Sequence, residues 1–195
     1  MSVKNSHTTC SGIDWNIIVG LLYRLRKENR IKEYLLIGLG CYTGLRIGDL
    51  LKLKWCDLQQ KNEITVRERK TGKIRKITIN ESLREIIKNA CEEFSRKLSY
   101  DVNQYLFQNS QGKIISIQYL NRLIKKTFDD YGIKSQNAST HTLRKTFGKR
   151  VWEMDGQSER SLIYLSQIFN HSNVSITRRY IGIVQEDIKN IYLSL

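Results

Sequence analysis

The segment Thr43–Leu50 reads TGLRIGDL, so that Arg46 follows a glycine turn and stands at the start of an expected helix. A guanidinium in this place can present its planar fork of N–H donors to a phosphate, with help from the free amides of the helix N-terminus. Asp49 lies three residues later on the same helix face, where its carboxylate would hold Arg46 in position. The alternative is an ordinary surface ion pair at a helix start.

A second segment, HTLR, places His141 and Arg144 three residues apart. On a helix this spacing projects both side chains to the same side. An imidazole exchanges protons near neutral pH, and a guanidinium clamps two phosphate oxygens. In isolation such a pair is more often two surface residues.

The third segment begins at His171 and ends at Tyr180, nine residues later. Its Ser and Asn residues are typical caps of a short helix. Arg178 and Arg179 precede the tyrosine, and positive charge beside a phenol favours the ionised form and attracts phosphate. The alternative is that Tyr180, one of ten tyrosines, packs in the core.

Lys70 lies at the tip of an expected hairpin, beside a Thr-Gly turn. A lysine on such a turn can reach into a DNA groove, although a solvated turn lysine is the commoner case.

These residues need elements to position them, and the sequence patterns predict mostly helices. The chain from Asn62 to Asn80 alternates apolar and charged residues on both sides of Gly72, which predicts a hairpin or a small three-stranded antiparallel sheet. Elsewhere apolar residues recur at helical spacing. The expected helices are one capped by Asp14 and running past Leu25, one over Ile31–Tyr42, one that starts near Arg46, and those over Ser82–Leu98, Ser116–Tyr131, His141–Met154, Ser161–Phe169, Ser175–Ile181 and Glu186–Leu193. The fold class is therefore mainly α with a small antiparallel β-sheet (α+β), in one domain.

Composition limits the classes of function. A net charge of +14 on 195 residues creates a positive field that attracts polyanions or acidic membrane surfaces. The four cysteines are widely spaced and form no CxxC pair, so neither zinc nor a disulfide framework is expected. The N-terminus lacks the apolar core of a signal peptide, and no apolar run is long enough to span a bilayer. We expect a cytoplasmic protein without a membrane partner, metal or other cofactor.

Taken together, the four segments resemble the tyrosine recombinase family, which includes phage and transposon integrases, Xer-type resolvases and invertases. TGLRIGDL resembles the family's TGLRxxEL box, HTLR matches its H-x-L-R box, and Lys70 follows Arg46 by 24 residues on the hairpin, where the family has a lysine. His171 and Tyr180 keep the family's interval. Two departures are Ile77-Thr78-Ile79, where the family often has Val-Pro, and Phe169-Asn170-His171, where it often has Leu-Gly-His.

The resemblance implies the DNA breaking-rejoining fold of the family's catalytic domain, over residues 13–195 after a polar leader of residues 1–12. We expect the family's N-terminal DNA-clamping domain to be absent from this chain. It also implies cleavage and rejoining of double-stranded DNA without metal or ATP, through a 3′-phosphotyrosyl bond to Tyr180. The implied catalytic residues are Arg46, Lys70, His141, Arg144, His171 and Tyr180, with Asp49 in support of Arg46.

The resemblance further implies a monomer in isolation and a homo-tetramer on DNA, in which the amphipathic segment QEDIKNIYLSL packs either on its own domain or on a neighbour. The expected role is that of a mobile-element integrase. A Xer-type resolvase, a type IB topoisomerase, and a non-catalytic DNA-binding domain that keeps the fold are the alternatives.

Overall fold

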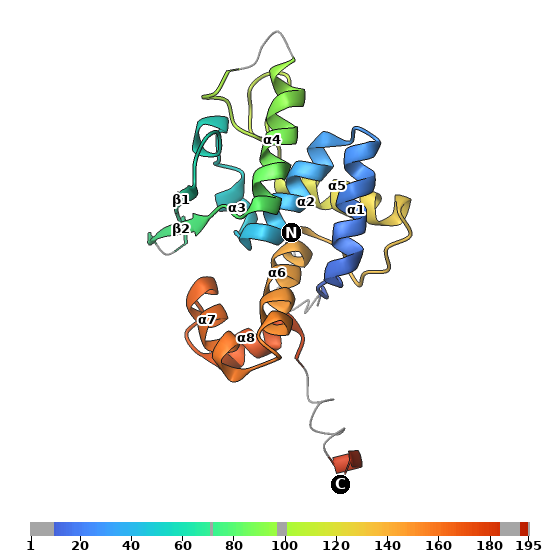
Figure 1. Ribbon diagram of the computed structural model, residues 1–195, viewed down its shortest axis with the longest axis vertical. Helices are drawn as coiled ribbons and strands as arrows, with labels where there is room; N and C mark the ends of the chain where they lie inside the picture. The colour runs from blue at the N-terminus through green and yellow to red at the C-terminus, as the bar shows by residue number, and fades with distance from the viewer. Residues whose placement is uncertain (1–9, 71, 97–100, 184–191, 195) are drawn as a thin grey trace.

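Helix α2 (Ile31–Thr43) is the centre of the fold. The computed structural model describes residues 10–70, 72–96, 101–183 and 192–194 of the chain. The α2 sequence IKEYLLIGLGCYT is apolar on nearly every face, and a helix of that kind is stable only when other elements surround it. Figure 1 shows it between its neighbours, with which it makes extensive contacts: α1 (Trp15–Lys27), α4 (Glu81–Ser95), α5 (Ile117–Asp130) and α6 (Thr140–Met154).

Side-chain caps fix where most of these helices begin. An oxygen of the N-cap side chain accepts a hydrogen bond from a backbone N–H of the first turn, which would otherwise lack a partner. The caps of this kind are Asp14 (α1), Asn80 (α4), Ser116 (α5), Ser158 (α7, Glu159–Phe169) and Asn173 (α8, Val174–Ile181). The prediction that Asp14 caps the first helix is confirmed.

The sheet is a single hairpin of two antiparallel strands, β1 (Glu63–Arg67) and β2 (Ile74–Thr78). Ile64 pairs with Ile77 and Val66 pairs with Arg75. Ile64 and Val66 are buried while their neighbours in β1 are exposed, so the strand has the alternation of a half-covered sheet. Of the two predicted arrangements, the described residues form the hairpin.

Helix α6 connects this main core to a second, smaller one. Its C-terminal half packs against α7 and α8, whose buried residues Leu162, Leu165, Phe169 and Ile181 form a separate apolar cluster. Figure 1 shows α7 and α8 gathered around the end of α6 that lies farthest from α4. Gly148 makes this packing possible, because a Cβ there would lie 2.6 Å from Ile181 and 3.0 Å from Phe169.

The predicted helices are confirmed where the structure describes them, with shifts of a few residues at their ends. Helix α7 begins at Glu159, and the helix predicted from Arg46 is the short α3 (Ile47–Leu50). A 3₁₀ turn at Trp55–Asp57 was not predicted. The end of the fourth predicted helix and most of the C-terminal segment after Ile183 lie outside the described residues.

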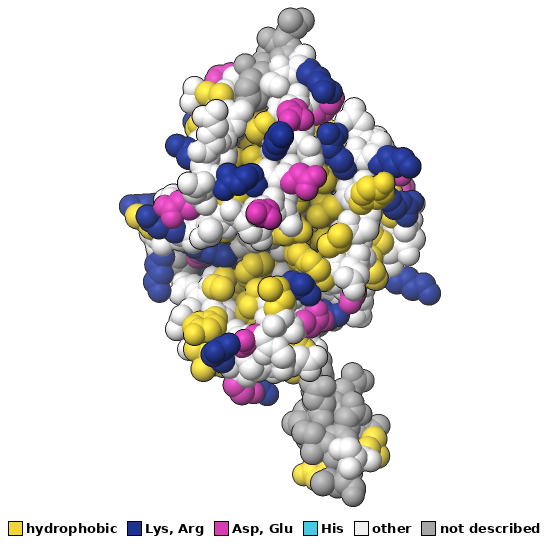
Figure 2. All heavy atoms as spheres, in the orientation of Figure 1, with side chains coloured by type: hydrophobic (Ala, Val, Ile, Leu, Met, Phe, Trp, Pro, Cys, Tyr) yellow, Lys and Arg dark blue, Asp and Glu magenta, His cyan; other side chains and the backbone are white. Residues whose placement is uncertain are grey.

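Basic side chains are scattered over the face of the molecule that Figure 2 shows. Figure 2 shows Lys and Arg side chains spread over the larger lobe, including the edge that the β1–β2 hairpin forms in Figure 1. In the part of the chain that the structure describes, no helix has both the length and the apolar character needed to cross a membrane.

Candidate active site

All six predicted catalytic side chains line one pocket. Its volume is about 590 Å³, and it lies between the N-terminal end of α3, the hairpin, the start of α6 and helix α8. The side chains come from segments as far apart in the sequence as residues 46 and 180, and the fold brings them together. The lining residues named by the sequence are Arg46, Asp49, Lys70, His141, Arg144, His171 and Tyr180.

Backbone carbonyl groups hold the two arginines of this pocket. Arg46 Nη2 donates to the carbonyl oxygen of Phe169 at 2.8 Å, and Arg144 Nη2 donates to the same oxygen at 3.2 Å. Arg144 Nη1 donates to the carbonyl of Gly44. Phe169 and Gly44 stand at the C-terminal ends of α7 and α2, where free carbonyls and the helix dipole favour a cation.

Burial places Arg144 in an unusual electrostatic environment. Only 3% of the residue is exposed, and its guanidinium lies 4.2 Å from the centre of the Phe169 ring. Burial, together with the charges of Arg46 and Arg75, lowers the pKa of Arg144 to about 10. The group remains a cation at neutral pH, and its poor solvation makes an incoming anion a strongly favourable partner.

The carboxylate that pairs with Arg46 is Glu68, at 2.7 Å from Nη1, and this corrects the expectation for Asp49. Asp49 Oδ1 instead accepts a hydrogen bond from the backbone N–H of Arg69 at 2.9 Å. Asp49 is buried, and its Oδ2 has no hydrogen-bond partner among the described residues. Asp49 therefore fastens the turn of the hairpin to α3.

The two histidines of the pocket are both biased toward the neutral form. Partial burial lowers the pKa of His141, and the positive charges of Arg144 and Lys145 lower it further. Burial likewise lowers the pKa of His171, with added effects of Arg144, Arg46 and Lys70. Neutral imidazoles at pH 7 are able to accept a proton or to donate one N–H.

Tyr180 is mostly buried, with its ring edge-on to two other rings. The centroid of the His171 ring is 5.3 Å away and that of Phe169 is 5.4 Å away. Burial raises the pKa of the Tyr180 phenol, and the charge of Arg144 opposes this rise. The phenol is therefore protonated at neutral pH, and a nucleophilic role requires a group that takes its proton.

The sequence predicted that the arginines next to Tyr180 would favour its ionised form. Arg178 instead forms an ion pair with Glu159 at the start of α7. The arginines whose charges lower the pKa of the phenol are Arg144 and Arg46, which come from other helices. The burial of the ring outweighs them.

Lys70 lines the pocket from the hairpin side. The hairpin turn is closed by backbone hydrogen bonds from Glu68 N–H to the Lys73 carbonyl and from Gly72 N–H to the Glu68 carbonyl. Lys73, the residue directly before β2, donates a hydrogen bond from its Nζ to Asn170 Oδ1 at 3.1 Å. Asn170 has left-handed backbone angles (φ 54°, ψ 50°), which glycine adopts freely and asparagine tolerates best among other residues.

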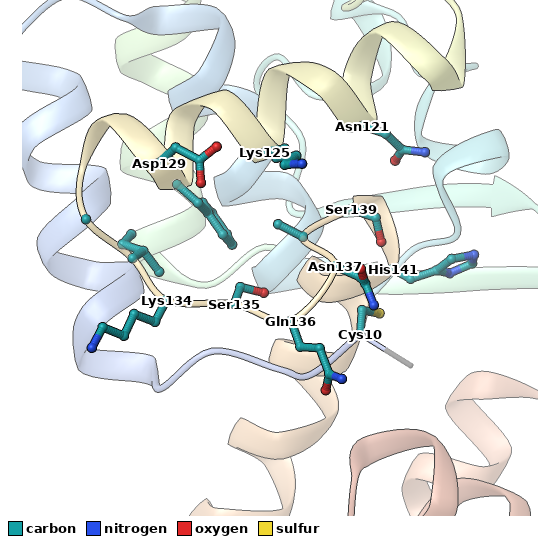
Figure 3. Close-up of a pocket in the computed structure, with 14 residues that line it drawn as sticks. Cys10, Asn121, Lys125, Asp129, Lys134, Ser135, Gln136, Asn137, Ser139 and His141 are labelled. Atoms are coloured by element: carbon teal, nitrogen blue, oxygen red, sulfur yellow. The ribbon is translucent and has the colours of Figure 1, made fainter. Parts of the chain in front are cut away.

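A larger hollow of about 1170 Å³ adjoins this pocket, and His141 lines both. Figure 3 shows Asn121, Lys125 and Asp129 projecting from α5 on one side, and the loop of residues 132–139 on the other. Asn121 Oδ1 accepts a hydrogen bond from the backbone N–H of Thr140, which fixes the first turn of α6 and hence His141. Among the described residues no group of three or more His, Cys, Asp or Glu side chains is placed to hold a metal ion.

Sequence reasoning missed three groups that organise the pocket: the carboxylate of Glu68, the carbonyl of Phe169, and the hydroxyl of Thr177, 2.9 Å from His171 Nδ1. Because every residue has a backbone carbonyl, the sequence does not show which carbonyl will bind an arginine. Glu68 had a weak signal, since it is an acidic residue in the basic hairpin segment ITVRERKTGKIRK.

Comparison with known proteins agrees with this geometry. The model of the phage integrase family matches residues 17–186. The chain is 36% identical over 171 residues to the probable integrase/recombinase YoeC of Bacillus subtilis strain 168, and the match covers 87% of each protein. It is 25% identical over 157 residues to the tyrosine recombinase XerH of Campylobacter jejuni, covering 79% of this chain and 42% of XerH.

Solved structures share the fold. The crystal structure of XerA recombinase aligns with a TM-score of 0.70 at 23% identity, covering 97% of this chain and 66% of that one. XerH bound to its difH substrate, in a pre-cleavage complex, aligns with a TM-score of 0.70 at 20% identity, covering 98% and 55%. This chain thus spans most of YoeC but about half of the XerH chains. The predicted fold and the predicted family resemblance are confirmed: the chain belongs to the phage integrase family and is a tyrosine-type recombinase catalytic domain.

Proposed function

We propose that the protein cleaves and rejoins double-stranded DNA at specific sites through a 3′-phosphotyrosyl intermediate on Tyr180. The observation that carries the proposal is the convergence of two arginines, a lysine, two imidazoles and one phenol on a single pocket large enough for a phosphodiester. Neither metal nor ATP enters the proposed reaction.

In the forward step, the Tyr180 oxygen attacks phosphorus and a new O–P bond forms as the bond to the 5′-oxygen breaks. His141 takes the phenol proton: its lowered pKa keeps the imidazole neutral and able to accept, and the raised pKa of the phenol means that Tyr180 needs such a base. Lys70 gives a proton to the departing 5′-oxygen. Rejoining is the same reaction in reverse, with a 5′-hydroxyl as the nucleophile.

The arginines stabilise the negative charge that grows on the non-bridging oxygens in the transition state. Arg46 and Arg144 each have N–H groups beyond those that bind the Phe169 carbonyl, and both line the pocket. Their shared carbonyl holds them in place before DNA arrives, so no reorganisation is needed at the moment of reaction. We assign His171 the same role, as a donor to a phosphate oxygen.

The hollow beside His141 supports a path for the neighbouring DNA backbone. It contains Lys125 and Lys134 and opens next to the pocket for the reacting phosphate. The positive charge of the whole chain supplies the long-range attraction, so we expect binding to weaken steeply as salt rises.

Exchange between two duplexes requires four strand cleavages, and each chain carries one complete pocket. We therefore propose that four copies assemble on DNA and that the chain alone is monomeric. In this reading the biological role is integration of a mobile element, which fits the integrase/recombinase name of YoeC. A Xer-type resolvase is the second candidate, which fits the names of other relatives.

The test is capture of a covalent adduct. A pool of random-sequence duplexes with nicks, which let the short cleaved fragment diffuse away, is incubated with the protein and resolved on a denaturing gel. We expect DNA bound to the native chain and none bound to Tyr180→Phe. An adduct that persists in Tyr180→Phe would reject Tyr180 as the nucleophile, and no adduct from any pool would reject the cleavage activity.

The captured DNA also decides the role. Sequences that match the ends of a mobile element support integration, and a single near-palindromic chromosomal site supports a resolvase.

A further inference from the structure

Glu68 is a buried carboxylate that no catalytic assignment above uses. Its residue is 3% exposed, although it belongs to a hairpin whose other charged side chains are mostly exposed. A buried carboxylate costs several kcal/mol of desolvation unless it is paired. Glu68 meets this cost with arginines: Oε2 lies 2.7 Å from Arg46 Nη1, and Oε1 lies 3.9 Å from Arg75 Nη1.

The pairing fixes the plane of the Arg46 guanidinium. Glu68 holds Nη1 and the carbonyl of Phe169 holds Nη2, so two nitrogens of the fork are anchored at once. Two anchors on a rigid planar group leave it one orientation. Glu68 does not line the pocket that contains Arg46, and it lies on the surface of neighbouring hollows instead. Glu68 therefore binds Arg46 on the side facing away from the pocket and leaves the pocket side of the guanidinium open.

The same contact ties Arg46 to Lys70. Glu68 precedes Lys70 by two residues, and its backbone N–H and carbonyl both take part in the hairpin turn. The second link between hairpin and α3, from Arg69 N–H to Asp49, is adjacent in sequence. A movement of the hairpin that carries Lys70 would thus break the contact that orients Arg46.

Glu68 also offsets a concentration of positive charge. Arg46, Arg75 and Arg144 lie close together. Burial lowers the pKa of Arg75 and of Arg144 and the charges of neighbouring arginines lower it further, whereas the charge of Glu68 raises it in both. Arg75 is itself mostly buried, and its Nη2 donates to the carbonyl of Thr43 at 2.6 Å. Without the carboxylate, mutual repulsion would favour the displacement of Arg46, the most exposed of the three.

We propose that Glu68 is a positioning residue, which orients Arg46 toward the reacting phosphate and couples it to the hairpin that carries Lys70. The role of Arg46 in this statement rests on the proposed function. The orientation of the guanidinium by Glu68 does not, and it can be measured without DNA.

The variants are Glu68→Gln, which keeps the volume and one acceptor oxygen but loses the charge, and Glu68→Ala, which loses both. The matched control is Glu63→Gln. Glu63 is the first residue of β1 and, like Glu68, pairs with a basic residue, Lys76, at 3.0 Å. Unlike Glu68, it is exposed and lies away from the pocket.

The first readout is the Nη1–H signal of Arg46, the group that donates to Glu68, in ¹⁵N-arginine-labelled protein without DNA. We expect a resolved, slowly exchanging signal in the native chain and in Glu63→Gln. In Glu68→Gln the exchange rate should rise by about tenfold or more, as expected when a charged hydrogen bond is weakened by some 1.4 kcal/mol. An unchanged signal in Glu68→Gln would overturn the proposal.

The second readout separates cleavage from binding on DNA recovered in the capture experiment. We expect single-turnover adduct formation at saturating DNA to fall about tenfold in Glu68→Gln and about a hundredfold in Glu68→Ala, with DNA affinity changed less than about threefold in both. Equal losses of affinity and rate, or native cleavage by folded Glu68→Gln, would overturn the positioning role. If Glu68→Ala does not fold, Glu68→Gln decides both readouts.

The two proposals fail differently. If the native chain forms no adduct while the Arg46 signal responds as expected, the proposed function is rejected and the positioning of Arg46 stands. If adducts form and the Arg46 signal is unchanged in Glu68→Gln, the proposed function stands and the positioning of Arg46 by Glu68 is rejected.

Discussion

The hydroxyl oxygen of Thr177 lies 2.9 Å from Nδ1 of His171. Thr177 is completely buried on α8, one turn before Tyr180, so the contact joins the imidazole to the helix that carries the proposed nucleophile. When a neutral imidazole accepts a hydrogen bond at Nδ1, its proton is on Nε2. A hydroxyl that donates to Nδ1 therefore leaves Nε2–H as a donor for a phosphate oxygen.

Replacing Thr177 with valine keeps the shape of the side chain and removes its hydroxyl. We expect single-turnover cleavage to fall about tenfold, which corresponds to one buried hydrogen bond of about 1.4 kcal/mol, because the tautomer of His171 is no longer fixed. Thr177→Ser restores the hydroxyl and should recover most of the rate. Equal rates in Thr177→Val and the native chain would show that the contact has no part in the reaction.

Adding a methyl group at Gly148 should displace α8. A Cβ there would meet Ile181 at 2.6 Å, so Gly148→Ala must push away the helix that positions Tyr180. We expect a loss of about 1–3 kcal/mol in the free energy of unfolding, measured in urea, and a fall in adduct formation. The control is Gly20→Ala on α1, where a Cβ would meet nothing within 4 Å and where alanine should stabilise the helix by about 0.5–1 kcal/mol. A Gly148→Ala protein as stable and active as the native chain contradicts this reading of the helix contact.

The residue before His171 offers a test of backbone strain. Asn170 stands where the resembling family often has glycine, and its left-handed conformation explains why glycine is acceptable there. We expect Asn170→Gly to be about as stable as the native chain and Asn170→Ala to be about 1 kcal/mol less stable than Asn170→Gly, because a Cβ without a polar group is strained at positive φ. Urea unfolding measures both. The opposite order of stability would contradict the assigned conformation.

The pocket histidines should titrate below pH 6.5 in the free protein. Burial and neighbouring cations disfavour the imidazolium, so both pKa values are lowered from 6.5. The unfolded chain then binds protons at a higher pH than the folded one, and stability falls as pH drops through about 6.5. NMR titration of the imidazole signals, assigned with His141→Gln and His171→Gln, measures the pKa values. A value above 6.5 for either residue in the absence of DNA would contradict the prediction.

Two lysines of the larger hollow should contribute to DNA affinity through charge alone. If Lys125 and Lys134 each neutralise one phosphate, the double variant Lys125→Gln/Lys134→Gln should reduce the slope of log affinity against log salt by about 1.8. The control is Lys88→Gln, which removes an exposed lysine on α4 that lines neither the larger hollow nor the pocket of the predicted catalytic residues. An unchanged slope in the double variant would place the DNA elsewhere.

Local patterns in the sequence determined the elements of this protein and the types of its reacting groups. Helical spacing and capping residues such as Asp14 and Asn173 predicted where helices begin, because these signals act within a few residues. The boxes around Arg46 and His141 predicted the chemistry, because a guanidinium and an imidazole keep their properties in any fold.

Only the tertiary structure decided which groups meet and in what electrostatic state. Glu68 rather than Asp49 pairs with Arg46, and one carbonyl of Phe169 receives both arginines, because these contacts depend on the packing of α3, α7 and the hairpin. The pKa of Tyr180 depends on burial of its ring against α6 and α7, which outweighs the charges nearby. Such long-range contacts have no local pattern, since a carbonyl position or a degree of burial is a property of the folded chain.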